Sequence, residues 1–282
     1  MYFDGERLVD GAGAPLDWPA LSVIGDPVAH SLSPALHAAA LQARDIQSRY
    51  EAIRVAGPSL ALALEAARAA GVRGLNLTLP LKEAVLELGV ARTDECERIG
   101  AANTLVLRRG DWMAHNTDAR GLAMALQRAL GASLGAALRR CVILGAGGAA
   151  RATAHALQGL GAGEVLIAAR EVSRADWARD FGGRSCVLGD LDTSRATLVI
   201  NCTPLGLDPA DPPPIDPGAL DPDAHLMDLT YGDQPSALLS QFAGRGQDGR
   251  AMLVAQAALS FSVWYGALPP LPQMAAAIGM DW

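Results

Sequence analysis

The chain has 282 residues, with 30 acidic and 23 basic side chains and a formal net charge of −7. This length is enough for one large domain or two medium ones, each with a sizeable core. No apolar run approaches the ~20 residues of a membrane-spanning helix, and a general nucleic-acid binder would need a basic face. The four cysteines (Cys96, Cys141, Cys186 and Cys202) lack CxxC spacing, and no two histidines have metal-ligand spacing. We therefore expect no disulfide framework, no metal, no membrane or nucleic-acid partner, and a reducing cytoplasm as the location.

The first half of the chain alternates short strands and helices. Strands are predicted at 21–25, 49–55 and 74–80, helices at 34–43, 58–70 and 81–89, and a hairpin at 103–107 and 112–116. In the third strand, three leucines alternate with Asn76 and Thr78, which is the period of a strand with one apolar and one polar face. The first half is thus predicted to be an α/β unit of the form βαβαβα followed by a hairpin.

In the second half of the chain, apolar strands are followed by helices. Helices are predicted at 119–130, 151–160 and 252–265, and strands at 141–144, 164–168, 197–201 and 226–230. This alternation predicts a parallel, doubly wound sheet. The segment 207–224 is rich in Pro and Asp and is expected to be an irregular loop. The last helix has no strand after it, so it can pack back on either half.

A glycine-rich turn joins the first strand of the second half to its helix. The pattern is Gly145-x-Gly147-x-x-Ala150, and a second strand ends about 20 residues later, as in dinucleotide-binding units. Glycines let the backbone approach a pyrophosphate, which the helix N-terminus then stabilises. A glycine-rich turn that holds no ligand is the alternative.

The end of the second strand bears on the choice of cofactor. Arg170 and Arg174 lie there, and Arg151 follows the glycine-rich turn, so three guanidinium groups can surround the 2′-phosphate of NADP. Glu171 instead suits the free ribose hydroxyl of NAD. NADP is therefore the favoured cofactor and NAD the alternative.

Lys82 is the only lysine of the chain, because the other basic residues are all arginines. Arg stays protonated in proteins, whereas Lys can give up its proton when it is partly desolvated. A proton-transfer role would explain why this one lysine is present, and chance is the alternative.

Several polar residues of the first half have both a functional and a structural interpretation. Ser31 and Ser33 precede a predicted helix, so they can hold a carboxylate, or Ser33 can simply cap the helix. Asp118 opens the helix 119–130 and can be its N-cap. Gln256 interrupts the apolar face of the last helix, where packing is the commoner role.

Taken together and in their order along the chain, these segments match one pattern. In order, the motifs GDPVAHSLSP, GLNLTLPLKE, GAANTL, NTD, GAGGAAR, INCTPLG and MLVAQA resemble the shikimate dehydrogenase family over about residues 21–268. The resemblance implies an N-terminal α/β substrate-binding domain at 20–118, completed by 252–282, and a C-terminal Rossmann-type domain at 119–251. It also implies the reversible reduction of 3-dehydroshikimate to shikimate, with NADP in most members.

The same resemblance implies roles for individual residues. Lys82 and Asp118 would form the catalytic pair, and the residues leave open which of them is the base. The substrate-side residues, which would hold the carboxylate and ring hydroxyls of a shikimate-like compound, are Ser31, Ser33, Asn76, Thr78, Asn103, Thr117, Tyr231 and Gln256. The cofactor-side residues are Gly145, Ala146, Gly147, Gly148, Ala149, Ala150, Arg151, Arg170, Arg174, Thr203 and Leu205. The assembly is expected to be a monomer or a homodimer.

Two alternatives to this function remain open. Glu171, which stands where the family usually has Thr, and an altered stretch at 231–251 favour a quinate or aminoshikimate dehydrogenase, with NAD as a possible cofactor. A dinucleotide-binding sensor without catalysis would explain the glycine-rich turn equally well, but it would leave Lys82 unexplained.

Overall fold

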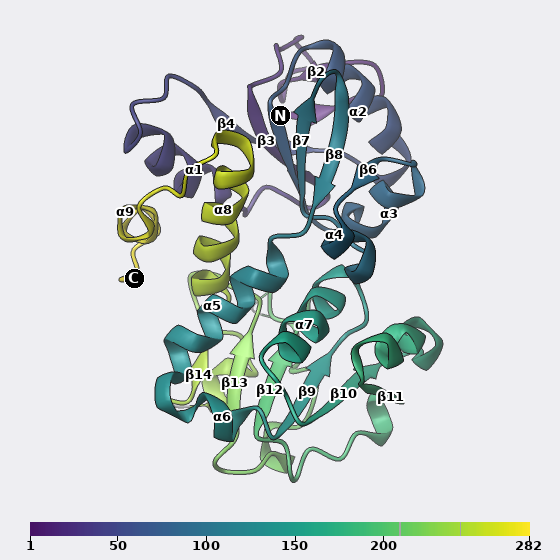
Figure 1. The fold of residues 1–282 in the computed structure, drawn as a ribbon, viewed down its shortest axis with the longest axis vertical. Coiled ribbons are helices and arrows are strands. Elements are labelled where there is room, and N and C mark those ends of the chain that lie inside the picture. The colour runs from purple at the N-terminus through teal and green to yellow at the C-terminus, as the bar shows by residue number, and fades with distance from the viewer. Residues whose placement is uncertain (209, 243) are drawn as a thin grey trace. The chain divides into compact units, whose positions relative to one another are not determined.

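The computed structural model describes residues 1–208, 210–242 and 244–282. Its contacts divide the chain into two compact units (Figure 1). Unit 1 comprises Met1–Thr117 and Val254–Trp282, and unit 2 comprises Asp118–Leu253. Both are α/β units, which confirms the predicted fold class. Over the described ranges, no helix is long and apolar enough to cross a membrane.

Unit 1, all of whose residues are described, is built on one sheet in the strand order β2-β1-β4-β3-β5-β7-β8-β6. The strands are β1 Tyr2–Phe3, β2 Leu8–Val9, β3 Leu21–Gly25, β4 Tyr50–Arg54, β5 Gly74–Leu77, β6 Ala91–Arg92, β7 Thr104–Arg108 and β8 Asp111–His115. The helices are α1 Ser33–Gln42, α2 Leu60–Ala69, α3 Leu81–Glu87, α4 Asp94–Ile99, α8 Arg250–Tyr265 and α9 Leu271–Ala276. Only the part of α8 from Val254 onward belongs to unit 1. Ile24, Ile53, Leu75 and Leu105 from the central strands are fully buried in its core.

Strand direction in this sheet determines which chain segments meet. β3 runs parallel to β4 and β5, whereas β7 is antiparallel to β5 and to β8. The carboxyl ends of β3, β5 and β8 therefore lie at the same edge as the amino end of β7. This is the edge from which most of the predicted substrate-side residues emerge.

The strand predicted at 74–80 differs from the observed β5 in length and in exposure. β5 ends at Leu77, and all four of its residues are buried, so the expected polar face is not open to solvent. The reason is tertiary, because the Ser260 hydroxyl of α8 lies 3.0 Å from the Asn76 amide. A helix from the far end of the sequence thus covers the polar side of the strand.

Some short elements were missed in the sequence. β1, β2 and β6 have two residues each, too few to show a period, and the first two extend the sheet beyond β4. α4 carried a recognisable signal, since Thr93 is its N-cap and accepts a hydrogen bond of 3.2 Å from the Cys96 amide.

Gly74 offers a direct test of the packing of α8 on this sheet. A Cβ at Gly74 would overlap Nε1 of Trp264, and that nitrogen donates a 2.9 Å hydrogen bond to the Leu105 carbonyl. We expect Gly74→Ala to lower the free energy of unfolding by about 1–3 kcal/mol, as overpacked core variants do. Urea unfolding would measure this loss. Gly159→Ala is the control, because nothing lies within 4 Å of its Cβ position in a helix, and it should be neutral or stabilising. A Gly74→Ala protein as stable as the original would contradict the contact.

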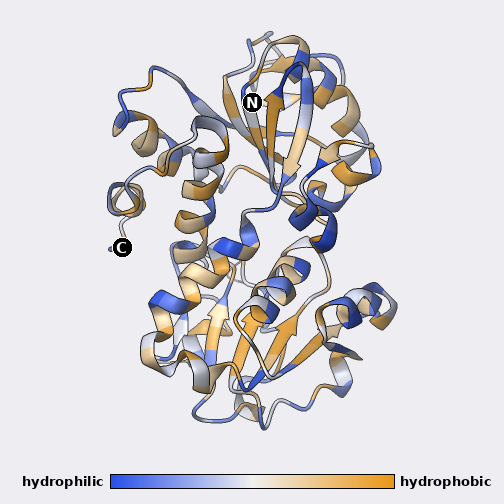
Figure 2. Cartoon of the chain, in the orientation of Figure 1, coloured by the Kyte–Doolittle hydropathy of each residue, from blue (hydrophilic) through white to orange (hydrophobic). Residues whose placement is uncertain are grey.

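Within the described residues of unit 2, the sheet is parallel and has the order β11-β10-β9-β12-β13-β14. The strands are β9 Arg140–Leu144, β10 Glu164–Ala169, β11 Arg184–Val187, β12 Leu198–Asn201, β13 His225–Asp228 and β14 Gly246–Gln247. The helices and 3-10 segments include α5 Asp118–Leu130, α6 Leu134–Ala137, α7 Gly148–Gly159 and η3 Val172–Phe181. Figure 2 shows the central strands as mostly hydrophobic and α7 as mixed, as expected for a sheet buried on both faces.

This topology confirms the predicted doubly wound parallel sheet. The chain runs from β9 outward to β11, then returns to β12 beside β9, so the order of strands reverses between β9 and β12. Ligands of such sheets bind outside the carboxyl ends at this point. The predicted loop 207–224 holds one short 3-10 turn, Pro217–Ala219, among its described residues, and residue 209 lies outside them.

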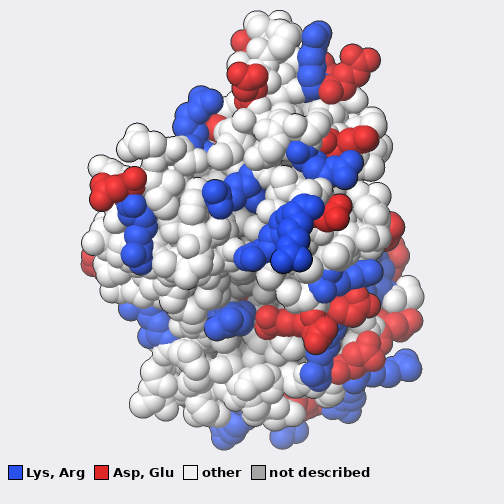
Figure 3. Space-filling model, turned by 45° about the horizontal axis from the view of Figure 1, so that its top comes forward, with Lys and Arg blue, Asp and Glu red and all other residues white. Residues whose placement is uncertain are grey.

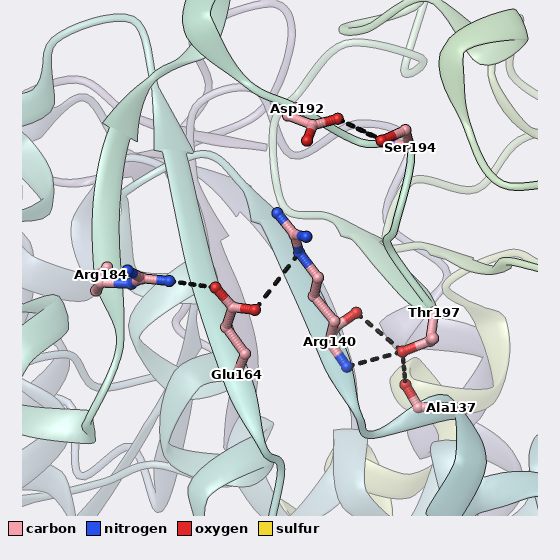
Figure 4. A network of polar contacts seen from close by, with 7 residues as sticks. All are labelled: Ala137, Arg140, Glu164, Arg184, Asp192, Ser194 and Thr197. Atoms are coloured by element: carbon pink, nitrogen blue, oxygen red, sulfur yellow. Dashed lines mark hydrogen bonds and ion pairs between the residues drawn. The ribbon is translucent and has the colours of Figure 1, made fainter.

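A polar network occupies the opposite, amino edge of this sheet (Figure 4). Glu164 forms ion pairs with Arg140, at 3.6 Å, and with Arg184. The Thr197 hydroxyl donates to the Ala137 carbonyl at 2.7 Å and accepts from the Arg140 amide at 2.8 Å. These contacts join β9, β10 and β11 to the segment before β12, so this edge has a structural role.

Candidate active site

The candidate residues of unit 1 emerge at the shared edge described above. Ser31 and Ser33 follow β3, Thr78 follows β5, Asn103 precedes β7, and Thr117 follows β8. Residues far apart in sequence are thus brought together by strand order alone. Lys82 lies at the start of α3, directly after the segment that leaves β5.

Ser31 and Ser33 lie at the beginning of α1. The helix starts at Ser33 with Leu32 as its N-cap, and no side chain caps it, so the simple N-cap interpretation of Ser33 is wrong. Instead, the Ser33 amide donates to Oγ of Ser31 at 3.3 Å. Ser33 is buried and Ser31 is half-buried. Two hydroxyls beside the first turn of a ten-residue helix are suited to an anionic group, because the helix N-terminus is electropositive.

Lys82 is held close to Asn103 through the backbone. The Ala102 amide donates to the Lys82 carbonyl at 2.7 Å, and the Leu77 amide donates to the Asn103 carbonyl at 2.9 Å. The Leu81 amide donates to the Thr78 carbonyl at 2.8 Å. Lys82 and Thr78 are half-buried, so both are partly accessible to a ligand at this edge.

Asn103, Thr117 and Gln256 form one buried hydrogen-bond network. The Thr117 amide donates to Oδ1 of Asn103 at 2.7 Å, and Nδ2 of Asn103 donates to Oε1 of Gln256 at 3.1 Å. The Thr117 hydroxyl also donates to the Gln256 carbonyl at 3.1 Å. These three residues are 2–7 % exposed. Gln256 is therefore more than a helix-packing residue, because its amide is oriented by the Asn103 side chain.

Asn76 belongs to the same network, but its amide is engaged with protein groups. Its Oδ1 accepts from the Tyr50 hydroxyl at 2.8 Å. Its Nδ2 lies 3.0 Å from the Asn103 carbonyl and 3.1 Å from Oγ1 of Thr104. These contacts suit Asn76 to orienting the edge rather than to direct ligand binding.

Sequence reasoning missed three members of this network: Tyr50, Thr104 and Ser260. All three are buried, and Ser260 and Thr104 lie 2.7 Å apart through their hydroxyls. A signal was available for Ser260, since it follows Gln256 by four residues and so shares its helix face. Thr104 and Tyr50 had no such signal.

Asp118 directly follows Thr117 in the chain and is the first residue of α5, in unit 2. The residue is buried, with 3 % of its surface exposed. Since Thr117 is fixed by Asn103, the backbone that leads into Asp118 is well anchored on the side of unit 1.

The glycine-rich turn of unit 2 fits a pyrophosphate. Gly145 has a φ of +105°, and a Cβ there would lie 3.3 Å from the backbone of Cys202, so only glycine suits this position. Gly147 is the N-cap of α7, and the first helical bond runs from the Arg151 amide to the Gly147 carbonyl at 3.1 Å. The amides of Gly148, Ala149 and Ala150 precede that bond and are therefore directed out of the helix end.

Thr203, Leu205 and Thr230, the residue before Tyr231, are positioned by two buried side chains at the same carboxyl edge. Asn201 accepts from the Thr203 amide at 3.0 Å and donates to the Leu205 carbonyl at 3.0 Å. Asp228 accepts from Asn201 at 2.9 Å and from the Thr230 hydroxyl at 2.8 Å. Both Asn201 and Asp228 are fully buried, so the segments after β12 and β13 are tied together.

The three candidate arginines lie around the carboxyl end of β10. Arg170 directly follows the strand and Arg174 is on η3, and both are exposed. The Arg151 guanidinium lies 5.1 Å from the centre of the Trp177 ring, which packs the start of α7 against η3. Arg170 also lines a pocket of about 550 Å³ whose other walls include Val187, Leu191 and Ile215.

The described histidines, cysteines and carboxylates can be compared with the arrangements that hold a metal ion or activate a thiol. Among these described residues, no group of three or more His, Cys, Asp or Glu residues is arranged to hold a metal ion. The cysteines are free, and burial raises the pKa of Cys96 and of Cys141 to about 12, so both thiols stay neutral.

On the face seen in Figure 3, acidic and basic side chains are interspersed.

Comparison with known proteins explains this combination of features. Residues 23–105 match the family model described as the shikimate dehydrogenase substrate binding domain. The shikimate dehydrogenase (NADP(+)) of Hyphomonas neptunium is 38% identical over 264 residues, which cover 90% of this chain and 94% of that protein. The chain belongs to the shikimate dehydrogenase family.

Solved structures agree with this membership. A Thermus thermophilus shikimate 5-dehydrogenase in complex with NADP(H) and shikimate matches with a TM-score of 0.80 and 37% identity, over 91% of this chain and 97% of that one. A Corynebacterium glutamicum quinate dehydrogenase in complex with NAD matches with a TM-score of 0.80 and 28% identity, over 92% and 97% of the two chains. The fold thus occurs with either substrate and either cofactor.

Proposed function

We propose that this chain is an NADP-linked shikimate dehydrogenase that reversibly reduces 3-dehydroshikimate to shikimate. The observation that carries the proposal is the convergence of Lys82, Asn103 and the paired serines at one sheet edge, in a chain that also has a dinucleotide turn. The similarity to relatives named as NADP(+) enzymes supports the same activity.

The polar groups of unit 1 suit a hydroxylated ring that carries a carboxylate. Ser31 and Ser33 would hold the carboxylate beside the N-terminus of α1, and Tyr231 is the further residue that we propose for carboxylate binding. Thr78, Asn103 and Gln256 would bind the ring hydroxyls. Asn103 and Gln256 are oriented before any ligand arrives, because each amide already bonds to the other. Such preorganisation favours one geometry of the reacting carbon.

The chemistry also needs a proton carrier. NADP⁺, when bound, would supply the acceptor for the hydride of the substrate carbon. The hydroxyl on that carbon must lose its proton at the same time, and we propose that Lys82 and Asp118 share this task. Lys82 would lie beside the hydroxyl that Asn103 positions, and Asp118 would complete the pair. In the reverse direction the same residues would return the proton to the oxygen.

The cofactor would be held at the carboxyl edge of unit 2. Gly145 and Gly147 would admit the pyrophosphate to the N-terminus of α7, and Arg170 and Arg174 would pair with the 2′-phosphate. The strand order supports this placement of the cofactor. The glycine-rich turn follows β9, Arg170 follows the neighbouring strand β10, and the pocket beside Arg170 extends toward β11. We infer that this pocket takes the adenine end of the cofactor.

We further propose that the domains are 20–118 with 252–282 for the substrate and 119–251 for the cofactor. We place the protein in the cytoplasm, as a monomer or a homodimer. The four free thiols, two of which are buried, support a reducing compartment. Gel filtration at two protein concentrations would decide between the two oligomeric states.

A quinate dehydrogenase that uses NAD is the second candidate function. Glu171 supports it, because this exposed carboxylate directly follows Arg170 and would repel a 2′-phosphate. The similarity to a quinate dehydrogenase that was solved with NAD supports the same candidate.

We expect Glu171→Thr to raise the preference for NADP⁺ over NAD⁺ about tenfold, since removing a charge beside the phosphate relieves a repulsion of about 1.4 kcal/mol. The measurement is kcat/KM for each cofactor at saturating shikimate. Glu164→Gln removes the same charge at the opposite end of β10 and serves as the control. An unchanged cofactor ratio in Glu171→Thr would exclude Glu171 from the phosphate site.

The proposed function is tested by the formation of reduced nicotinamide. Shikimate and quinate should each be assayed with NADP⁺ and with NAD⁺. Rapid reduction of NADP⁺ with shikimate is expected. A large preference for quinate with NAD⁺ would establish the second candidate instead, and no activity in all four assays would refute both.

A further inference from the structure

Ser260 lies at the centre of the buried network and contacts groups from four different segments. It is fully buried, one helical turn after Gln256 on α8, so both side chains face the same side of the helix. Its Oγ lies 2.9 Å from the Gln256 carbonyl, 3.0 Å from Nδ2 of Asn76, 2.7 Å from Oγ1 of Thr104 and 3.0 Å from Oγ1 of Thr117. No single element of unit 1 could hold these four groups in register.

The hydrogens available to Ser260 restrict how the network can be arranged. A hydroxyl has one hydrogen to donate and two lone pairs to accept with. If its hydrogen goes to the Gln256 carbonyl, its lone pairs accept from the Asn76 amide and from one threonine hydroxyl. Asn76 is already oriented by Tyr50, whose hydroxyl bonds to its Oδ1. In this arrangement Ser260 uses its one hydrogen and both lone pairs within the network.

The network leads from Ser260 to the residues proposed to contact substrate. Thr117, which Ser260 contacts, donates its amide hydrogen to Oδ1 of Asn103. This contact directs Nδ2 of Asn103 toward Oε1 of Gln256. Ser260 thus bonds to the backbone carbonyl of Gln256, while Asn103, which Ser260 reaches through Thr117, orients the side-chain amide of Gln256.

We propose that Ser260 is a positioning residue for the reaction. It orients the amides of Asn103 and Gln256 toward the substrate ring and anchors Thr117, the residue that precedes Asp118. It does not touch the reacting atoms itself. The inference rests on the proposed function, since it names a further residue for that same site.

Ser260→Ala tests the proposal, because alanine removes the hydroxyl and leaves the packing of α8 nearly intact. We expect kcat/KM for shikimate to fall about 10- to 100-fold, as small misplacements of binding groups do. The change should appear in both kcat and the KM for shikimate, whereas the KM for NADP⁺ should stay at its original value. Ser260→Thr keeps the Oγ and should recover most of the loss.

The matched control is Ser262→Ala on the same helix. The Ser262 hydroxyl donates to the Leu259 carbonyl at 2.7 Å, so the variant loses the same kind of backbone contact outside the network. Its kinetic constants should equal those of the unmodified protein. Thermal unfolding of all variants separates a loss of stability from a loss of positioning.

The outcomes are distinct. If the unmodified protein oxidises shikimate and Ser260→Ala keeps both kcat and KM for it, the positioning role is refuted, even if the melting temperature falls. If both alanine variants lose activity equally, the effect belongs to α8 in general, and the proposal is again refuted. If the unmodified protein oxidises neither shikimate nor quinate, the proposed function fails first, and this result is visible before any variant is compared.

Discussion

Lys82→Met should lower kcat for shikimate oxidation by about 10²- to 10⁴-fold, the usual contribution of a positioned acid–base group. The effect on the KM for shikimate should be much smaller, because the carboxylate and ring hydroxyls would still be held by Ser31, Ser33 and Asn103. Lys82→Arg should be nearly as inactive, since arginine keeps the positive charge but does not release its proton. Steady-state kinetics of both variants measure this difference.

The lysine content of the chain provides an independent check. Because Lys82 is its only lysine, an amine-specific reagent can modify only Lys82 and the α-amino group. Reductive methylation should change turnover in the unmodified protein, and shikimate with NADP⁺ should protect against modification at Lys82. Lys82→Met, with the α-amino group alone available, is the control. If Lys82→Arg retained full activity, proton transfer by this residue would be excluded and only its charge would matter.

The stability of the protein should fall as the pH is lowered from 7 toward 4, chiefly because of His37. Burial lowers the pKa of His37 from 6.5 to about 3, and the side chain of Asn76 only partly opposes this shift. The unfolded chain binds a proton near pH 6.5 while the folded chain does not, so unfolding takes up a proton and becomes easier in acid. At pH 5 the expected loss is about 2 kcal/mol relative to pH 7, and the full loss near pH 3 is about 5 kcal/mol.

The tertiary structure explains why His37 stays neutral. It is fully buried on α1, its ring stacks on Tyr50 at 4.2 Å between centroids, and Trp264 lies 5.2 Å away. His115 also makes the protein less stable in acid, because burial lowers its pKa as well. The exposed carboxylates with lowered pKa values, such as Asp4 and Asp10, contribute at more acidic pH, because they protonate below their ordinary value of 3.8.

Urea unfolding at pH 5 and pH 7 tests this prediction. In His37→Phe, which retains a ring against Tyr50 but cannot take up a proton, the difference between the two pH values should shrink by about 2 kcal/mol. His30→Phe is the control, because His30 is exposed and its loss should leave the difference unchanged. Equal pH dependence in all three proteins would show that His37 does not govern acid stability.

Local patterns were sufficient for much of the fold. The predicted helix 34–43, hairpin 103–116 and strand 141–144 correspond to α1, β7 with β8, and β9 within one or two residues. They were predictable because each carries its own period or turn residues over enough length. β1, β2 and β6 were not, because two residues show no period and pairing with a neighbouring strand decides their conformation.

The candidate site likewise has one part that local sequence signals predict and another part that depends on tertiary contacts. The sequence by itself was enough to select the candidate residues: a single lysine, two serines at the start of a helix, and a glycine-rich turn between a strand and a helix. These are local signals, set by residue type and spacing. Only the tertiary structure decided that Asn76 is engaged with Tyr50, that Gln256 is oriented by Asn103, and that Ser260 joins them. Those contacts join residues as many as 184 positions apart, and they exist because strand order brings one sheet edge together and α8 returns to cover it.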